Sequence, residues 1–177
     1  MKIILLDGGP ASGKNTLGTI MVHEFEKQGA NSILLDHDVY VERLNPTWVW
    51  KNEQVKIEDL ENARTSFAQD IDKYLQQNFV VIAIGERFLT EVQITHFLDR
   101  LRTSTTAQLF HLSVPISLRK ERLHRRGAHS LIDLDQDQKD RDSNARWLGY
   151  VYENSNSPEQ DAMNIMKLVQ DNYGFID

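Results

Sequence analysis

The sequence of 177 residues contains no cysteine, which excludes disulfide bonds and thiolate metal sites. It also has few prolines and no long hydrophobic run. The first apolar stretch, residues 3–6, ends at a polar turn. That stretch is too short for a signal peptide or a transmembrane helix. The net charge of −6 argues against a general attraction to nucleic acid or to anionic membranes. We therefore expect a cytoplasmic protein whose partners are small molecules, not membranes or nucleic acid.

What is present is an ordinary globular composition, 40% hydrophobic and 26% charged, with no linker and no internal repeat. Short apolar runs alternate with longer amphipathic segments, a pattern typical of βαβ units and a parallel sheet. We expect strands at residues 3–6, 32–35, 79–84, 108–114 and 149–152. We expect helices at residues 14–28, 58–77, 90–102, between 115 and 127, and from 157 onward, with loop and a short helix over 40–56. The prediction is an α/β fold: one domain over residues 1–177 with a doubly wound, five-stranded parallel sheet.

A glycine-rich stretch, GGPASGKNT at residues 8–16, follows the first expected strand. It meets the pattern G-x-x-x-x-G-K at Gly8, Gly13 and Lys14, and an expected helix comes next. Backbone N–H groups must point inward to bind an anion, and glycine most readily adopts the curvature that this needs. The helix N-terminus adds a partial positive charge, and Lys14 adds a full charge toward the β- and γ-phosphates. The stretch therefore predicts a nucleotide-binding loop, with an ordinary βα turn as the alternative.

This loop resembles the P-loop of the small nucleotide and metabolite kinases, the group that includes adenylate kinase. Their common form, G-x-P-G-x-G-K-G-T, is matched at Gly8, Pro10, Gly13, Lys14 and Thr16, and it is not matched at Ala11 and Asn15. The resemblance implies P-loop kinase topology, ATP as the cofactor and Mg²⁺ as the metal. The nucleotide-binding residues that it implies are Gly8, Ala11, Ser12, Gly13, Lys14, Asn15 and Thr16, with Asn154 as a contact of the adenine base.

The ligand of Mg²⁺ is open, because Asn15 stands where the usual pattern has a hydroxyl. Either the amide oxygen of Asn15 faces the water shell of the metal, or Thr16 contacts the α-phosphate while phosphates and carboxylates hold the metal. Glu86, directly after the third expected strand, is a candidate for the acid that orders the metal's water. The candidate metal residues are therefore Asn15, Thr16 and Glu86.

Two carboxylates, Asp36 and Asp38, follow the second expected strand, at the edge where open α/β sheets bind ligands. In kinases of this type an acidic residue there often positions or deprotonates the acceptor hydroxyl. We assign this role to Asp36, which is nearer to the strand, with capping of the next helix as the alternative. Arg87 is loosely similar to the arginine with which adenylate kinases grip the acceptor phosphate, and a surface ion pair is its alternative. The expected substrate-binding residues are Asp36, Asp38, Arg43, Glu86 and Arg87.

The basic stretch RKERLHRR, residues 119–126, places several arginines on one helical face. In P-loop kinases the corresponding helix runs into a mobile lid whose arginines close over the transferring phosphoryl group, since the planar guanidinium binds phosphate oxygens in a bidentate way. We predict a helical lid over residues 119–146, with the polar run 133–142 as a mobile part of it. The catalytic arginines are expected to be Arg122 and Arg126, with Arg141 or Arg146 as a further contact; a solvated basic face is the alternative.

Together these features predict a kinase that transfers the γ-phosphoryl group of ATP to a hydroxyl of a metabolite, nucleoside or antibiotic. Its catalytic residues would be Lys14, Asp36, Arg122 and Arg126. Two close carboxylates favour a hydroxyl acceptor, whereas Arg43, Arg64 and Arg87 would favour the phosphate acceptor of a nucleoside monophosphate kinase. A nucleotide-binding regulatory protein with little turnover is the alternative from a different class, because Asn15 leaves metal binding open.

Overall fold

A computed structural model of the chain describes residues 2–46, 56–127, 133–144 and 148–176. Five strands form a parallel sheet, as the sequence predicts, and their order is β2-β3-β1-β4-β5. A short sixth strand, which the sequence did not predict, pairs antiparallel with β4. The strands are β1 (Lys2–Asp7), β2 (Ser32–Asp36), β3 (Val80–Ile84), β4 (Thr106–Ser113), β5 (Tyr150–Glu153) and β6 (Phe175–Ile176).

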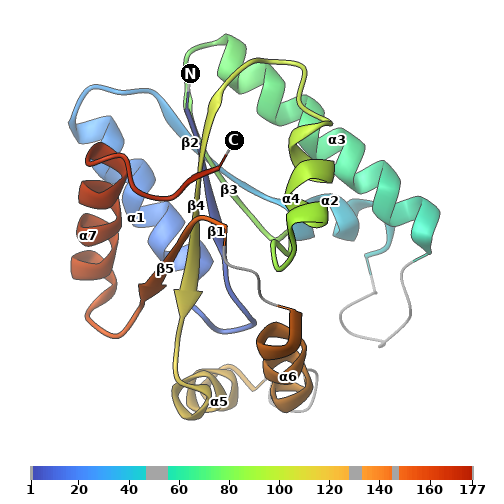
Figure 1. Cartoon of the computed structure of the whole chain (residues 1–177), viewed down its shortest axis with the longest axis vertical. Helices are drawn as coiled ribbons and strands as arrows, with labels where there is room; N and C mark the ends of the chain where they lie inside the picture. The colour runs from blue at the N-terminus through green and yellow to red at the C-terminus, as the bar shows by residue number, and fades with distance from the viewer. Residues whose placement is uncertain (1, 47–55, 128–132, 145–147, 177) are drawn as a thin grey trace.

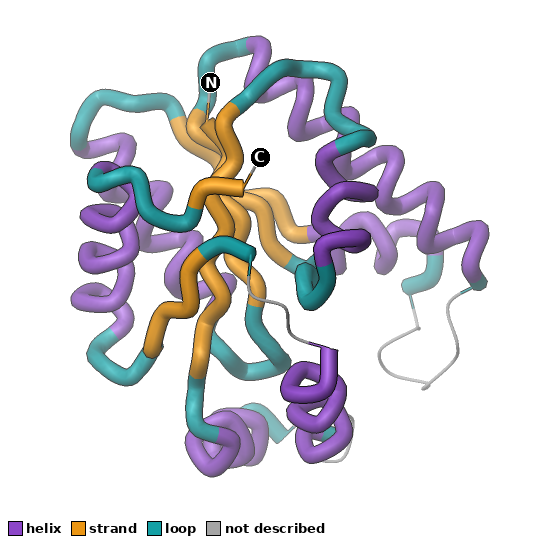
Figure 2. The backbone as a smooth tube through the Cα atoms, in the orientation of Figure 1, coloured by secondary structure: helices purple, strands orange, loops and turns teal. Residues whose placement is uncertain are grey.

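Helices cover both faces of this sheet (Figure 1). One face carries α1 (Lys14–Lys27) and α7 (Pro158–Gln170), and the other carries α3 (Ile57–Gln76) and α4 (Glu91–Leu98). The short helix α2 (His37–Leu44) follows β2 without a break. Two further helices, α5 (Ile116–Arg125) and α6 (Leu134–Asn144), lie beyond the carboxyl end of β4, away from the body of the sheet (Figure 2). No described helix has the length and apolar composition needed to span a membrane.

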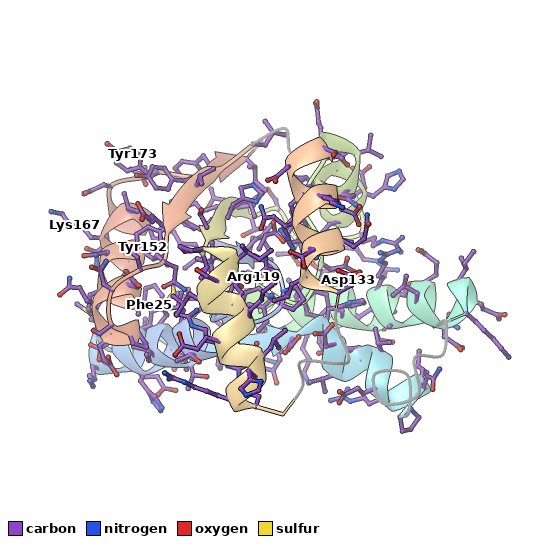
Figure 3. The ribbon with its side chains drawn as sticks, turned by 90° about the horizontal axis from the view of Figure 1, so that it is seen from below. Phe25, Arg119, Asp133, Tyr152, Lys167 and Tyr173 are labelled. Carbon is purple, nitrogen blue, oxygen red and sulfur yellow. The ribbon has the colours of Figure 1, made fainter. Side chains whose placement is uncertain are left out.

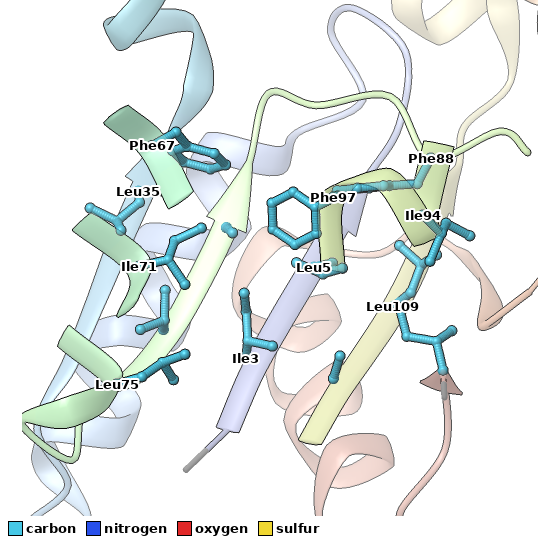
Figure 4. Close-up of a cluster of buried hydrophobic side chains, with 14 of the residues drawn as sticks. Ile3, Leu5, Leu35, Phe67, Ile71, Leu75, Phe88, Ile94, Phe97 and Leu109 are labelled. Carbon is cyan, nitrogen blue, oxygen red and sulfur yellow. The ribbon is translucent and has the colours of Figure 1, made fainter. Parts of the chain in front are cut away.

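The core consists of two layers because successive residues of a strand point to opposite faces of the sheet. In β1, Ile3 and Leu5 belong to the layer under α3 and α4, whereas Ile4 and Leu6 belong to the layer under α1 and α7. Figure 4 shows the first layer, in which side chains of α3 and α4 meet those of β1, β2 and β4. These four side chains of β1 are fully buried. Strand β1 is therefore held rigidly, and the loop that follows it starts from a defined position.

One expected element differs from the structure because of a tertiary contact. The helix expected over 90–102 ends at Leu98, because the buried carboxylate of Asp72 in α3 accepts hydrogen bonds from the backbone N–H groups of Arg102 and Thr103. The run 133–142 falls largely within the helix α6, and its mobility stays a prediction. Arg146, expected as a further phosphate contact, lies outside the described residues.

Candidate functional site

The glycine-rich loop forms the curved connection that the sequence predicts between β1 and α1. Gly13 caps α1 with a left-handed backbone, φ 100°, a conformation that glycine adopts without strain. Gly8 is close to Ser12, so that a Cβ on Gly8 would lie 2.5 Å from the Ser12 hydroxyl. Lys14 folds back into the loop, and its ammonium group donates to the carbonyl of Gly8 at 2.6 Å. Burial lowers the pKa of Lys14, while the nearby charge of Asp7 opposes that shift.

Three side chains from outside the loop bind three successive loop carbonyls. Arg119 donates to Pro10 O at 2.9 Å, Arg122 donates to Ala11 O at 3.1 Å, and Asn154 donates to Ser12 O at 2.6 Å. These hydrogen bonds hold the loop carbonyls in place, and an anion-binding nest depends on such a fixed backbone curve. Figure 3 looks onto this edge, with Arg119 on α5 beside α6. Arg119, Arg122 and Asn154 therefore each hold the backbone of the loop.

The loop also contains a hydrogen-bond donor that is free to bind a phosphate. The hydroxyl of Ser12 is buried and has no hydrogen-bond partner within the described parts of the chain. Buried polar groups are normally paired, so an unpaired one inside a glycine-rich curve suits a site that receives an anion. The residues present therefore fit the phosphates of ATP.

One cavity lies beside the start of α1 and brings together residues that are far apart in the sequence. Its volume is about 220 Å³. Five of the predicted nucleotide-binding and catalytic residues line it: Gly13, Thr16, Arg122, Arg126 and Asn154. Leu17, Arg125, Asn156 and Pro158 complete the lining. The basic end of α5 and the loop after β5 thus border the same space as the P-loop.

The two carboxylates after β2 have different surroundings. Asp36 is the N-cap of α2: its Oδ1 accepts from the backbone N–H of Asp38 at 3.1 Å, and its Oδ2 accepts from the side-chain amide of Asn15 at 2.8 Å. The alternative role of Asp36 as a helix cap is therefore present in the structure. Asp38 is exposed as a whole residue and lines a second cavity. Desolvation of its carboxyl group, and secondarily the negative charge of Asp36, raise the pKa of Asp38 to about 6.

This second cavity, of about 360 Å³, lies between α2, α3, α4 and the segment after β3. Its apolar side is formed by Val41, Leu60, Phe67 and Phe97. Its polar side is formed by His37, Asp38, Glu61, Arg64, Gly85, Glu86, Arg87, Gln93, His96 and Arg100. Of the predicted substrate-binding residues, Asp38, Glu86 and Arg87 therefore lie together at one cavity. Arg43 is not among the lining residues, because its guanidinium packs over the ring of Tyr40 at 4.8 Å.

Several charged groups of this cavity pair with one another, whereas Arg87 pairs with Asp137 of α6. Glu86 accepts from Arg64 at 3.0 Å and lies 3.3 Å from the imidazole of His37. Glu61 pairs with Arg64 at 2.8 Å and with Arg100 at 2.6 Å. These pairs place cations and carboxylates around the apolar side of the cavity. The cavity therefore suits a compact polar molecule that accepts hydrogen bonds from the arginines and donates them to the carboxylates.

Beneath the loop lies a buried ionic network that the sequence analysis did not anticipate. Asp7, 1% exposed, lies 2.9 Å from His111 and accepts from Arg141 at 3.0 Å. Burial alone would raise the pKa of Asp7, but the hydrogen bond with His111 and the charge of Arg141 outweigh it and lower that pKa to about 2. In α6, Asp137 accepts from Arg119 at 2.6 Å, from Arg87 at 3.2 Å and from Arg141 at 3.3 Å.

A signal for part of this network exists in the sequence. Asp7 and His111 are polar residues at or within apolar strand runs, which marks them as buried groups in need of partners. Their partner Arg141 comes from a polar segment far along the chain, and nothing in the sequence pairs it with Asp7. In the structure the guanidinium of Arg141 is bound to the carboxylates of Asp7 and Asp137. Its contact with a phosphate stays a prediction.

The candidate metal residues are spread around the loop. Asn15 is bonded to Asp36, Glu86 is bonded to Arg64, and Thr16 borders the smaller cavity. Within the described ranges, no group of three or more His, Asp or Glu side chains is arranged to hold a metal ion. Kinases commonly hold Mg²⁺ through nucleotide phosphates and one or two carboxylates. The donor set here, with carboxylates next to the P-loop, fits that kind of binding.

Comparison with known proteins bears on the fold of the chain. A family model described as "Chromatin associated protein KTI12" matches residues 1–88, which include the glycine-rich loop and Glu86. No curated protein matches the sequence. Among solved structures, a sugar kinase from a Janibacter species is similar with a TM-score of 0.70 at 18% identity, over 96% of this chain and 95% of that chain.

Two further solved structures show the same similarity. Shikimate kinase from Aquifex aeolicus has a TM-score of 0.62 at 17% identity, over 97% of this chain and 98% of that chain. The APS kinase of Mycobacterium tuberculosis, in complex with AMPPNP and APS, has a TM-score of 0.68 at 12% identity, over 96% and 97% of the two chains. The chain therefore has the P-loop kinase fold, and the predicted resemblance and fold class are confirmed.

Proposed function

We propose that the protein is a phosphotransferase that uses ATP and Mg²⁺ to phosphorylate a hydroxyl group of a small molecule. The observation that carries the proposal is the position of Asp38, which lines the cavity of about 360 Å³ and whose negative charge acts on the pKa of Lys14 in the P-loop. The cavity of about 220 Å³ borders Gly13 and Thr16 of the same loop. The two cavities provide one place for an acceptor and another for a nucleotide. The fold shared with sugar, shikimate and APS kinases supports this assignment.

In this proposal Asp38 is the base. A bond forms between the acceptor oxygen and the γ-phosphorus as the bond from that phosphorus to the β–γ bridging oxygen breaks, and the hydroxyl proton passes to the Asp38 carboxylate. A pKa of about 6 leaves Asp38 ionised and able to take up a proton near neutral pH. Both oxygens of Asp36 already accept hydrogen bonds. The contacts therefore favour Asp38 as the base over Asp36, which the sequence interpretation preferred.

The cations around the loop would stabilise the charge of the transferring group. Lys14 lies inside the loop, and Arg122 and Arg126 border the nucleotide-side cavity. Phosphoryl transfer depends mainly on such positioning and charge stabilisation. Mg²⁺, when bound, supplies further neutralisation of the phosphates, and Thr16 and Glu86 are the residues proposed to hold its water shell.

The test is a screen of ATP consumption with separate panels of sugars and hydroxy acids, nucleosides, and nucleoside monophosphates. We expect turnover with a hydroxyl acceptor, dependent on Mg²⁺ and absent in the Lys14→Ala variant. The acceptor product, identified by mass spectrometry, should carry one additional phosphate. Tight ATP binding without turnover on any panel would contradict the proposal and favour the regulatory, nucleotide-binding alternative.

A second candidate is supported by the arginines of the same cavity. Arg64, Arg87 and Arg100 all line it, and guanidinium groups are the usual ligands of an acceptor phosphate. Under this alternative the acceptor is a nucleoside monophosphate, and its phosphate displaces Glu61 or Asp137 from the arginines. Turnover confined to the monophosphate panel would support this candidate over a hydroxyl acceptor.

A further inference from the structure

Asn15 makes a contact that connects the two sides of the site. It is the second residue of α1, directly after Lys14, and its side-chain Nδ2 donates to Oδ2 of Asp36 at 2.8 Å. Asp36 ends β2, so this hydrogen bond joins the nucleotide loop to the strand that leads to the acceptor cavity. The two residues are 21 positions apart. The bond therefore depends on the packing of β2 and α1, not on local chain geometry.

Asp36 is restrained from two more directions. Its other oxygen, Oδ1, accepts from the backbone N–H of Asp38, the second residue of α2, and so caps that helix. Gly85 packs directly against it: a Cβ on Gly85 would lie 2.6 Å from Asp36 Oδ1 and 2.8 Å from the backbone nitrogen of His37. The carboxylate is thus held between the first turn of α1, the first turn of α2 and the end of β3.

An asparagine is chemically suited to this contact. A carboxylate accepts hydrogen bonds and needs a donor, and the asparagine amide provides N–H groups on an arm one bond longer than the hydroxyl of serine or threonine. A serine in this position would have to bridge the gap with a shorter side chain. Aspartate, with the same shape, would lose the donor and add a second negative charge beside Asp36.

We infer that Asn15 is a positioning residue, which holds Asp36 and with it the first turn of α2 in the geometry that presents Asp38 to the acceptor. This inference rests on the proposed function for its catalytic consequence. It assigns Asn15 a role different from that of a metal ligand. The orientation of Asp38 relative to the loop then depends on an amide that belongs to the loop itself.

A set of four proteins tests the contact itself without an acceptor: the native chain, Asn15→Asp, Asp36→Asn, and the double variant Asn15→Asp/Asp36→Asn. Urea unfolding of the nucleotide-free proteins is the first measurement. Asn15→Asp should shift the unfolding equilibrium by about 2- to 10-fold, the range for one hydrogen bond. The double variant restores a donor–acceptor pair with the roles exchanged, and asparagine retains the capping of α2. It should recover most of the loss, and purely additive effects of the two substitutions would overturn the inference.

The second measurement separates positioning from metal binding. ATP affinity is compared with and without Mg²⁺ for Asn15→Ala and for Thr16→Ala. We expect Asn15→Ala to keep the increase in affinity that Mg²⁺ produces in the native chain, and Thr16→Ala to weaken nucleotide binding more. Loss of the Mg²⁺ effect in Asn15→Ala alone would show that Asn15 acts on the metal and would overturn the inference.

The third measurement uses an acceptor that the screen identifies. Asn15→Ala should lower kcat by about 10-fold or more with little change in the KM for ATP, since the misplaced carboxylate acts in the transition state. In the Asp36→Ala background, where residue 36 has no side-chain acceptor for Asn15, the same substitution should have almost no further effect. Two independent, multiplicative losses would contradict the positioning role. If no acceptor is found, the proposed function fails while the unfolding and Mg²⁺ measurements still decide the role of Asn15.

Discussion

At the scale of single residues, side chains of the same type have different surroundings and contacts in the site. Asp36 and Asp38 are both acidic and lie two positions apart, but one is engaged through both oxygens and the other lines a cavity. Arg119 and Arg122 belong to the same basic stretch, yet Arg119 is 2% exposed and bonded to Pro10, Asp137 and Gln138. Burial and partners, not residue type, decide which group is free to meet a ligand.

Lys14 is expected to contribute charge rather than packing. Lys14→Ala should weaken ATP binding by roughly 10- to 100-fold, the range for losing a charged hydrogen bond, and should abolish transfer. The fold should remain, because the hydrogen bonds of the ammonium group to the described residues go to the loop carbonyls of Gly8 and Gly9. Calorimetric titration with ATP and circular dichroism measure the two effects. Lys27→Ala, at the opposite end of α1, serves as the control and should bind ATP like the native chain.

Asp38 is expected to lower the folding stability above pH 6 and to be needed for turnover. Its folded-state pKa, about 6, lies above the ordinary value, so its contribution to stability is present below about pH 4 and is lost as pH rises through 6. Asp38→Asn should therefore raise stability at pH 8 by up to about 1 kcal/mol, a figure reduced for solvent screening. With a hydroxyl acceptor, turnover should fall roughly 10²- to 10⁴-fold.

Thermal unfolding at pH 5 and pH 8, together with kcat, checks both effects of Asp38→Asn. Unchanged turnover in Asp38→Asn, combined with a raised acceptor KM in Arg64→Ala or Arg87→Ala, would instead indicate a phosphate acceptor. Arg43→Ala is the matched control, since Arg43 is not among the residues lining the cavity.

At the scale of elements, α6 is held mainly by polar contacts. Leu134 is its only apolar residue, so the helix has almost no hydrophobic face with which to dock. Its anchors are Asp137, which binds three arginines, and Arg141, which binds Asp7. An element held this way can open without exposing a large apolar surface. This is consistent with the proposal that residues 119–146 act as a lid.

Removal of the central anchor should loosen α6 selectively. Asp137→Asn takes away the charge that holds Arg87, Arg119 and Arg141, so amide hydrogen exchange in residues 134–144 should speed up by about 10-fold or more. Exchange in β1 and β4 should change little. Asp135→Asn is the control: it affects only the exposed pair with Lys120, and such pairs contribute little. Equal effects of the two variants would contradict the role of Asp137 as the anchor.

At the scale of the whole molecule, the parallel sheet brings the site together. All five parallel strands end at the same edge, and each leads into a part of the site. The loop follows β1, Asp36 ends β2 and Glu86 follows β3. Helix α5, with Arg119 and Arg122, follows β4, and Asn154 follows β5. The Asp7 network then ties β1 to β4 and to α6 at that edge. The site is therefore a property of strand order, with each strand contributing one or two groups.

The network around Asp7 should control the acid stability of the whole chain. Because its folded-state pKa is lowered to about 2, Asp7 contributes stability above about pH 4 that is lost as pH falls toward 2. A difference of about two pKa units corresponds to roughly 2–3 kcal/mol. Asp7→Asn should be less stable at pH 7 and should lose less stability between pH 4 and pH 2. Urea unfolding across that range checks this, with the exposed Asp171→Asn as control; an equally steep acid loss in both variants would contradict it.

Sequence patterns by themselves determined the fold class and the nucleotide loop. The five parallel strands, the loop at residues 8–16 and the long helices were predictable because hydrophobic periodicity and glycine spacing are local signals. Tertiary structure alone decided which charged groups meet. Asn15 bonds to Asp36, Asp137 collects three arginines, and Arg141 reaches Asp7 across 134 positions. Such pairings depend on strand order and helix docking, which bring distant segments to one edge of the sheet. The identity of a polar residue in the sequence does not indicate which distant residue it will contact.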